Sequence, residues 1–171
     1  MARLRKFTAY KNLERPYTRT SKYNKKNFIR GGFPNLKIVK FETGTANGTF
    51  DTTVQLLSQG HLNIRHNALE SARLTSNKLL EKNLGKAYHL RIKTYPHHVL
   101  RENALASGAG ADRLSTGMKK SFGKIVGAAA RVKEGQAIME VRVDKANVKL
   151  AKQALERASK KMPCSCKVTV A

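Results

Sequence analysis

Residues 88–95 read YHLRIKTY and alternate between two kinds of side chain. Because successive side chains of a strand point to opposite faces of a sheet, this alternation predicts a β-strand. One predicted face is mostly apolar and carries Tyr88, Leu90, Ile92 and Thr94, whereas the other is cationic with an aromatic and carries His89, Arg91, Lys93 and Tyr95. Pro96 would end the strand, since proline cannot donate to a strand ladder. The stretch therefore predicts a sheet with one apolar face and one cationic face.

The segments on either side complete an α+β domain. Period-2 alternation predicts further strands, and apolar spacings of three and four residues predict two helices. In chain order we expect strands at 36–41 and 50–56, a helix at 61–83, the strand at 88–95, strands at 122–132 and 136–143, a helix at 145–162 and a strand at 164–170. This order, ββ-α-βββ-α-β, predicts an α+β fold in which helices and sheet form layers.

The predicted domain organisation has two parts. Residues 1–34 are basic and polar with single interleaved aromatics and no periodicity, so we expect an extended basic arm. The arm is either a disordered tail or a segment that becomes ordered on RNA, and the aromatics favour RNA because their rings stack on bases. Residues 35–171 are expected to form a single α+β domain, in which the pattern-breaking segment 96–120 is a long functional loop.

The charge indicates a polyanionic partner. The chain has 34 Lys and Arg against 11 Asp and Glu, a net charge of +23, and residues 1–40 hold twelve of the bases and one acid. A lone domain is destabilised by such self-repulsion, and a surface charged only for solubility usually mixes both signs. Nucleic acid fits best, because Lys and Arg displace condensed counterions from phosphates. The first six residues are not followed by an apolar stretch, so we expect neither a secretory signal nor a membrane span.

Motifs that would indicate an enzyme do not fit their templates. The glycines at 108 and 110 resemble a dinucleotide-binding loop, but Arg113 stands where the third glycine belongs. The segment from Gly117 to Lys124 resembles a P-loop with one residue too many, and Ile125 replaces the Ser or Thr that holds magnesium. The five histidines form no nucleophile–base motif, and acids are scarce. We expect no catalysis, no cofactor and no metal.

Cys164 and Cys166 are expected on one face of the final strand. Strand geometry would place these side chains about 7 Å apart, which is poor for a disulfide. A metal would need partners such as His97 and His98, and nothing in the sequence places them nearby. Buried cysteines that pack as small apolar residues are the favoured interpretation.

Several blocks of the sequence resemble a known family. They are RPYTR at 15–19, IRHNALESAR at 64–73, YPHHVLREN at 95–103 and GAGADR at 108–113, together with FGKIVG at 122–127. These blocks resemble the archaeal and eukaryotic ten-e ribosomal proteins, which belong with bacterial large-subunit ribosomal protein sixteen. The likeness runs from Arg15 to Val168 and is closer to the archaeal relatives than to the eukaryotic ones.

The resemblance implies an α/β-hammerhead fold and a place on 23S-type ribosomal RNA near the elbow of the A-site transfer RNA. It also implies that the loop from Arg101 to Arg113 points toward the peptidyl-transferase centre, and that the protein joins late in large-subunit assembly. The implied partners are large-subunit ribosomal RNA, A-site transfer RNA and neighbouring large-subunit ribosomal proteins. We expect a ribosome-bound cytoplasmic protein without a homo-oligomer.

The candidate site residues fall into two groups. The first would bind ribosomal RNA through phosphate contacts and base stacking: Arg3, Arg5, Lys6, Arg15, Tyr17, Arg19, Lys22, Lys25, Lys26, Arg30, Arg91, Lys93, Lys119, Lys120 and Lys124. The second would form the loop near transfer RNA: Arg101, Glu102, Asn103, Gly108, Gly110, Asp112 and Arg113.

Two other function classes remain open from the residues. One is a free-standing RNA-binding module or assembly chaperone outside the mature ribosome. The other is an RNA-modifying enzyme, which would need a cofactor loop or paired acids.

Overall fold

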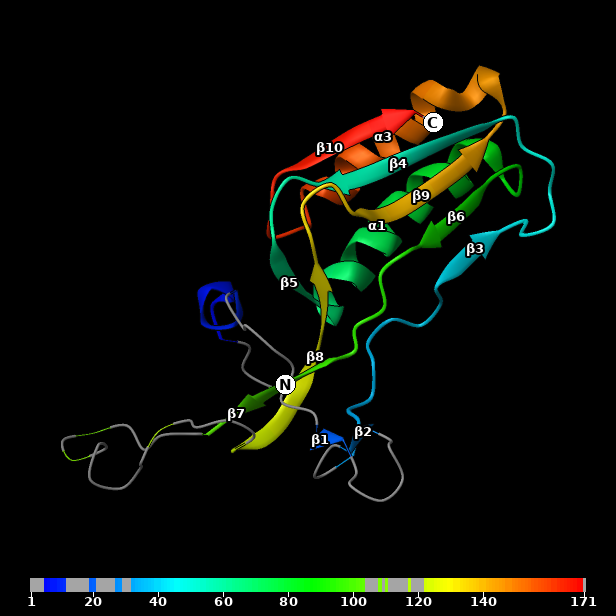
Figure 1. Ribbon diagram of the computed structural model, residues 1–171. Helices are drawn as coiled ribbons and strands as arrows, with labels where there is room; N and C mark the ends of the chain where they lie inside the picture. The colour runs from blue at the N-terminus through cyan, green and yellow to red at the C-terminus, as the bar shows by residue number, and fades with distance from the viewer. Residues whose placement is uncertain are drawn as a thin grey trace.

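The computed structural model describes residues 5–11, 19–20, 27–28, 32–103, 108, 110, 117 and 122–170 (Figure 1). Its elements in chain order are η1 (Phe7–Tyr10), β1 (Arg19–Thr20), β2 (Asn27–Phe28), β3 (Glu42–Gly44), β4 (Thr52–Ser58), β5 (Leu62–Arg65), α1 (His66–Leu84), β6 (His89–Ile92), β7 (His98–Glu102), β8 (Lys124–Val132), β9 (Ala137–Val143), η2 (Lys145–Asn147), α3 (Val148–Ser159) and β10 (Cys166–Val170). The fold is therefore α+β, as predicted.

The strands form separate antiparallel sheets. The largest has five strands in the order β10-β4-β9-β6-β3, a second has three in the order β5-β8-β7, and β1 pairs with β2. The helices α1 and α3 lie side by side against one face of the five-stranded sheet, and the strands cross in front of them in Figure 1. The long strand β8 continues away from this layered part and carries β7 with it (Figure 1).

The core lies between the helices and the five-stranded sheet. Val54, Val141 and Leu90 are opposite one another on β4, β9 and β6 and are fully or almost fully buried. Leu69 of α1 and Leu155 of α3 are also fully buried in the same cluster. On α3 the other buried residues are the alanines at 151, 154 and 158, whose small side chains allow the helix backbone to approach the sheet closely.

Most of the predicted elements are confirmed, but the structure adds or moves several strands, among them β3 at Glu42–Gly44, which was not predicted. The predicted strand at 36–41 is wrong, because the backbone N–H groups of Lys37 and Val39 donate to side chains of α1 and not to a neighbouring strand. Residues 62–65 form β5 before α1 begins at His66, although the sequence predicts helix from residue 61. Residues 98–102 form β7 inside the predicted loop 96–120.

The N-terminal residues 5–11, assigned from sequence to the arm, pack on the three-stranded sheet. The Asn63 side-chain amide donates to the Tyr10 carbonyl at 3.1 Å, and Arg65 donates to the Arg5 carbonyl at 3.0 Å. The Arg65 guanidinium also lies 5.5 Å from the centre of the Tyr10 ring, a cation–π distance. Buried Tyr10 contacts Leu100 and Ala129, so residues 5–11 are anchored on the three-stranded sheet.

Gly44 allows β3 to pair closely with β6. Its φ is +89°, and a Cβ added there would lie 2.0 Å from the carbonyl oxygen of Tyr88. We expect Gly44→Ala to lower the free energy of unfolding by about 1–3 kcal/mol, because the strained φ and the backbone clash both act in the folded state. Urea denaturation would measure this change.

Gly60→Ala is the matched control. A Cβ at Gly60 would meet no atom within 4 Å, and its φ lies outside the positive range. We expect this variant to change stability by about 1 kcal/mol or less. An equal loss in both variants would contradict the role given to Gly44.

Candidate nucleic-acid interface

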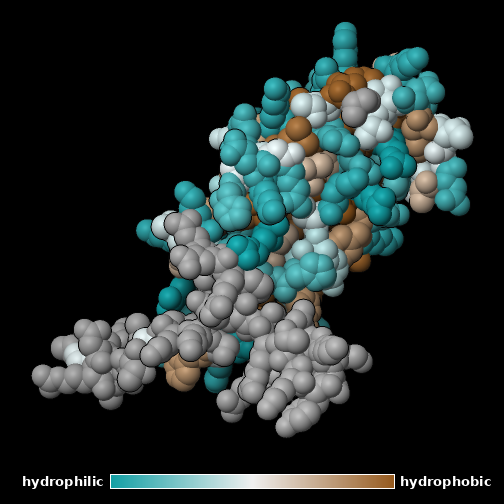
Figure 2. Space-filling view, in the orientation of Figure 1, coloured by the Kyte–Doolittle hydropathy of each residue, from teal (hydrophilic) through white to brown (hydrophobic). Residues whose placement is uncertain are grey.

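The face of the five-stranded sheet that points away from the helices is polar. On this surface, called the open face here, Gln55, Glu140, Arg91 and Glu42 are opposite one another across β4, β9, β6 and β3. The same alternation that buries Val54, Val141 and Leu90 therefore places charged residues outward. In Figure 2, hydrophilic side chains predominate over this part of the molecule.

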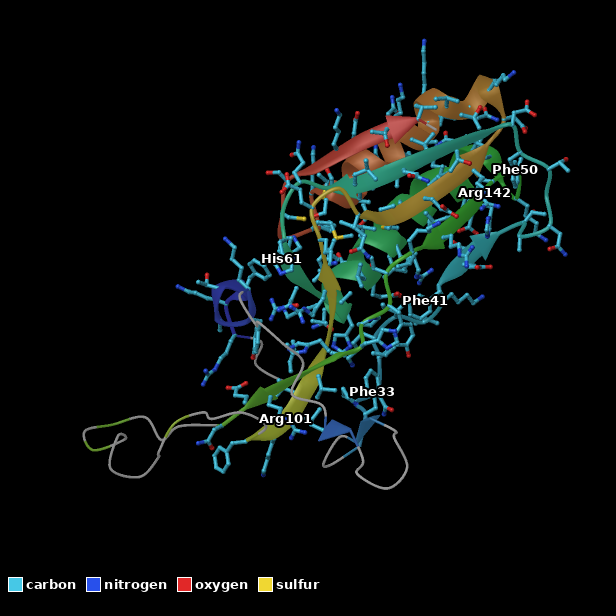
Figure 3. The ribbon with its side chains drawn as sticks, viewed as in Figure 1. Phe33, Phe41, Phe50, His61, Arg101 and Arg142 are labelled. Atoms are coloured by element: carbon cyan, nitrogen blue, oxygen red, sulfur yellow. The ribbon has the colours of Figure 1, made fainter. Side chains whose placement is uncertain are left out.

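A buried carboxylate orients two cations of the open face. Glu140 is 2% exposed, and its two carboxylate oxygens lie 3.1 Å from Lys93 Nζ and 3.3 Å from Arg142 Nη2. The Lys93 and Arg142 side chains themselves remain 40% and 43% exposed. One acid is therefore shared by two accessible cations, and the triad of Lys93, Glu140 and Arg142 carries a net positive charge. Figure 3 labels Arg142 on this face.

Arg91 forms a second ion pair on the open face. Its Nε lies 3.0 Å from a carboxylate oxygen of Glu42, and both side chains are about half exposed. His89 is buried beside the same carboxylate, with its Nε2 3.7 Å from Glu42. Exposed pairs of this kind contribute little to stability, so Arg91 is well placed to exchange its carboxylate for a phosphate. Arg91 and Lys93, both predicted from sequence as RNA-binding, lie together on the open face.

An aromatic group follows the cations along the chain. Exposed residues continue to alternate with buried ones after β6, so Tyr95 and His97 are exposed while Thr94 and His98 are buried. The Tyr95 ring stacks on Phe41 with 5.2 Å between centroids and 20° between planes, and it lies 4.5 Å from the His97 ring. Tyr95 is 45% exposed. Phe41, labelled in Figure 3, is half-buried against the core and supports Tyr95 from behind.

Sequence reasoning placed Tyr95 on the cationic face but did not select Phe41, His97, Glu140 or Arg142 as site residues. The signal for His97 is present, since the exposed positions at 91, 93, 95 and 97 keep a period of two. Phe41 and Glu140 join the site only through pairing with distant strands, and no local pattern reveals that pairing.

Residues near the end of β7 form a second cationic region. Arg101 Nη1 donates to the Gly123 carbonyl at 3.3 Å, and Glu102 pairs with Arg5 at 2.8 Å. Lys124 is opposite Glu102 on β8 and is exposed. Arg101, labelled in Figure 3, lies far from Arg142, so β7 and the open face are distinct surfaces.

The remaining predicted site residues are placed less completely. Lys6 is exposed just before η1, Asn103 follows β7, and Gly108 and Gly110 both have positive φ. The backbone of Arg19 lies in β1. Outside the described residues lie Arg3, Arg15, Tyr17, Lys22, Lys25, Lys26, Arg30, Asp112, Arg113, Lys119 and Lys120.

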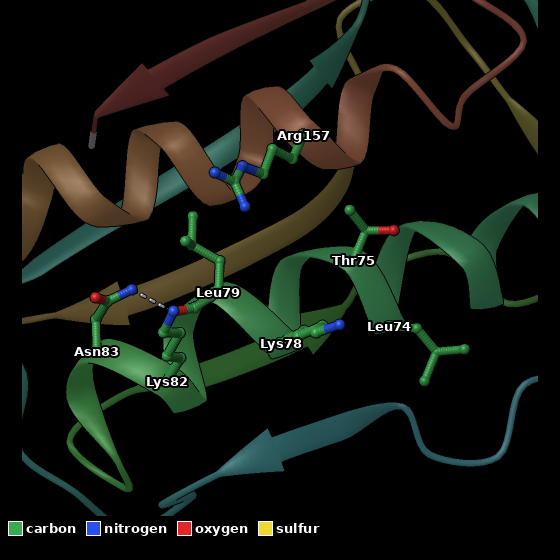
Figure 4. A pocket seen from close by; sticks show the side chains of 7 residues that line it. All are labelled: Leu74, Thr75, Lys78, Leu79, Lys82, Asn83 and Arg157. Atoms are coloured by element: carbon green, nitrogen blue, oxygen red, sulfur yellow. Dashed lines mark hydrogen bonds between the residues drawn. The ribbon is translucent and has the colours of Figure 1, made fainter.

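A groove between α1 and α3 is lined by basic, polar and apolar side chains. It encloses about 540 Å³ and is lined by Leu74, Thr75, Lys78, Leu79, Lys82, Asn83 and Arg157 (Figure 4). The lining side chains include two lysines and an arginine and no carboxylate, imidazole or thiol. Across the part of the chain that the structure describes, no three His, Cys, Asp or Glu residues gather as a metal site. None of the described helices is long and apolar enough to cross a membrane.

Comparison with known proteins gives one consistent family. Residues 17–169 match the model of the family described as ribosomal protein L16p/L10e. The "Large ribosomal subunit protein uL16" of Methanococcus aeolicus is 45% identical over 168 residues, which are 98% of this chain and 94% of the relative. The proteins of the same name from Staphylothermus marinus and Picrophilus torridus are each 48% identical, over 85% and 91% of this chain and 84% and 90% of their own lengths.

Proposed function

Because the chain belongs to the ribosomal protein L16p/L10e family, we propose that its open face and aromatic group bind large-subunit ribosomal RNA. The chain is a structural constituent of the large ribosomal subunit, and its family is structural rather than catalytic. The observation that carries the RNA proposal is the Lys93–Glu140–Arg142 triad, in which a buried acid holds two cations toward solvent.

The triad suits phosphate recognition for an electrostatic reason. A shared carboxylate limits the freedom of both cations, so less side-chain entropy is lost when they meet a phosphate. Arg142 can then donate in a bidentate fashion, and Lys93 supplies a second positive charge. Arg91 on β6 lies directly opposite Glu140 on β9 and so adds a third cation to the same surface. The net charge of +23 supplies the longer-range attraction.

The aromatic group suits an unpaired base. Protein aromatics recognise RNA mainly where bases are unstacked from the helix, and each such stack contributes about 1–3 kcal/mol. The ring of Tyr95 is partly exposed and stacks on Phe41 with 20° between the two ring planes. Lys93 lies two residues earlier in the extended segment, so a base on Tyr95 would bring the neighbouring phosphate toward the triad.

Replacement of Tyr95 by alanine tests the base contact. We expect Tyr95→Ala to weaken binding of the full-length protein to large-subunit ribosomal RNA by about 5- to 150-fold, because one base loses its stacking partner. The dependence of affinity on salt should stay unchanged, since no charge is removed. Filter binding across a salt series would measure both quantities.

Tyr95→Phe is the matched control for this variant. It keeps the ring and removes only the hydroxyl, so we expect affinity close to that of the unchanged protein. If Tyr95→Ala also bound as tightly as the unchanged protein, the base contact would be refuted while phosphate binding by the triad would still stand.

We extend the proposal to the N-terminal arm, the domain and the segment 101–113, for which the support is the resemblance to the family. The basic arm within residues 1–34 threads between RNA helices, and residues 35–171 form one domain of α/β-hammerhead type. The segment from Arg101 to Arg113 lies near the A-site transfer RNA, beside neighbouring large-subunit proteins. The protein joins the ribosome late in assembly, acts in the cytoplasm, and supports translation by positioning RNA.

Crosslinking of intact large subunits tests the proposal. Ultraviolet crosslinks from Tyr95 and His97 to ribosomal RNA are expected, together with cofractionation of the chain with large subunits through a moderate salt wash. A chain that sediments apart from the large subunit would instead favour a free-standing RNA-binding module.

A further inference from the structure

Cys164 and Cys166 lie closer together than their spacing predicts. The expected separation of about 7 Å assumes that both residues lie in one extended strand. β10 begins only at Cys166, and the backbone bends at Cys164. The two Sγ atoms are 3.6 Å apart, both cysteines are free, and both are partly exposed. Both cysteines are partly buried and pack against the hydrophobic core, as the sequence-based interpretation expected, but the predicted separation of their side chains is wrong.

The surroundings of Cys164 favour its ionised form. The Ser58 hydroxyl, which is buried at the end of β4, donates to the Gly60 carbonyl at 2.7 Å and lies 3.8 Å from Cys164 Sγ, as a second and weaker acceptor. The hydrogen bond with the Cys166 thiol, and to a smaller extent the one with Ser58, outweighs the effect of burial and lowers the pKa of Cys164 to about 6. The pKa of Cys166 is raised, because its proton is held between the two sulfur atoms and its side chain is half-buried. Within the pair, these opposite shifts favour Cys164 as the nucleophile and Cys166 as the thiol that keeps its proton.

We propose that Cys164 and Cys166 form a redox-active dithiol that a hydroperoxide oxidises to a disulfide within the chain. The Cys164 thiolate attacks one peroxide oxygen, the O–O bond breaks, and water or an alcohol leaves after taking up a proton. The resulting sulfenic acid is attacked by Cys166, which loses its proton, and hydroxide leaves as water. Two thiols and one hydroperoxide therefore give one disulfide, one water and one further water or alcohol.

The second step is favoured by position. The sulfur of Cys166 already touches that of Cys164, so no strand of the five-stranded sheet has to move for the bond to form. The backbone on the far side is fixed, since the Gln59 N–H donates to the Ser165 carbonyl at 3.0 Å. The bend at Cys164, which precedes this hydrogen bond in the chain, therefore takes up the change. This dithiol lies at the edge of the sheet formed by β10 and β4. The inference does not depend on RNA binding.

Peroxide treatment of the purified full-length protein tests the proposal. We expect the intact mass to fall by two hydrogens, both thiols to become unreactive toward maleimide, and the chain to remain a monomer on non-reducing gels. Dithiothreitol should restore both thiols. Formation of covalent dimers, or stepwise oxidation to sulfinic acid with no disulfide, would overturn the proposal.

Single-cysteine variants separate the two roles. In Cys166→Ser, peroxide should leave Cys164 as a sulfenic acid that dimedone traps, because the resolving thiol is gone. In Cys164→Ser, the remaining Cys166 should react with peroxide and dimedone much more slowly. Equal trapping in both variants would contradict the assignment of Cys164 as the nucleophile.

The pH dependence of alkylation reports the ionisation of Cys164, and a change in the stability of the fold would not shift its midpoint. Iodoacetamide should modify Cys164 with a midpoint near pH 6, since the thiolate is the reactive form. Ser58→Ala removes one donor and should move this midpoint upward. A midpoint near that of an ordinary thiol in the unchanged protein would refute the activated thiolate.

Discussion

Binding of the full-length chain to large-subunit ribosomal RNA is expected to weaken by about three to five orders of magnitude between about 50 and 200 mM salt. That range corresponds to about six to ten phosphates neutralised by Lys and Arg. The chain has 34 such residues, and the open face and the N-terminal residues present several of them at the surface. Each contact releases condensed counterions, and added salt opposes that release. Titrations at four or five salt concentrations would give the slope directly.

A matched pair of variants assigns part of this slope to the open face. The triple variant Lys93→Gln/Glu140→Gln/Arg142→Gln removes two cations together with the acid that they share, so no buried carboxylate is left unpaired. Its net charge falls by one. Lys152→Gln on the exposed side of α3 also lowers the net charge by one, but it lies on the helix layer.

We expect the triple variant to lower the salt slope by about two phosphate contacts and the α3 variant to leave it nearly unchanged. Equal slopes in the two variants would mean that only net charge matters, and the open face would lose its role. A flat salt response in the unchanged protein would count against RNA binding altogether.

Arg91 and Lys93 of the open face could be predicted from sequence, but the pairing of the strands that form this face could not. Strict alternation in 88–95 correctly placed Arg91 and Lys93 on the face opposite Leu90 and Ile92. The pairing of Lys93 with Glu140 joins residues that are far apart in the chain, and that register depends on strand order. Arg142 and Glu140 therefore looked like ordinary alternating residues of a strand.

The errors in the predicted secondary structure also arise from contacts between residues that are far apart in the chain. The alternation at 36–41 is only local: Ile38 is buried between exposed Lys37 and Val39, whereas Lys40, two residues on, is exposed. It does not make a strand, because His66 and Glu70 of α1 accept the backbone hydrogen bonds that a partner strand would have supplied. In β7, His98, Val99 and Leu100 are all buried, so no alternation was available to indicate a strand.

His98 combines deep burial with an ionisable ring. It is 2% exposed, and neither ring nitrogen has a hydrogen-bond partner among the described residues. Burial, together with the positive charge of Arg131, lowers the pKa of His98 to about 4 from 6.5. His66, against which Gly127 of β8 packs closely, has its pKa lowered in the same direction by burial and by Lys37 and Arg65. Both rings are neutral in the folded protein at neutral pH.

The free energy of unfolding should therefore fall as the pH is lowered from 6.5, the ordinary pKa of histidine, to about 4, the pKa of His98 in the folded protein. Above about pH 6.5 His98 is neutral in both states and its contribution to stability is fully present. Below pH 6.5 the unfolded chain takes up a proton that the folded chain refuses, so stability falls by up to about 3 kcal/mol by pH 4. Urea denaturation at several pH values between 7 and 5, before most carboxylates titrate, would measure the upper part of this loss.

Comparison with two variants isolates the contribution of His98. His98→Leu fills a similar space without an ionisable ring, so it should remain folded at pH 7 and lose clearly less stability on acidification than the unchanged protein. The part that remains in this variant reflects His66 and Cys164, because each has a pKa lowered in the folded state and so also costs stability as the pH falls. His61→Gln changes an exposed histidine and should retain the full loss. If His98→Leu and the unchanged protein lost stability in parallel, the acid sensitivity would originate from other residues. The ring of His98 would then be able to take up a proton in the folded state, which would contradict the burial of its two nitrogens.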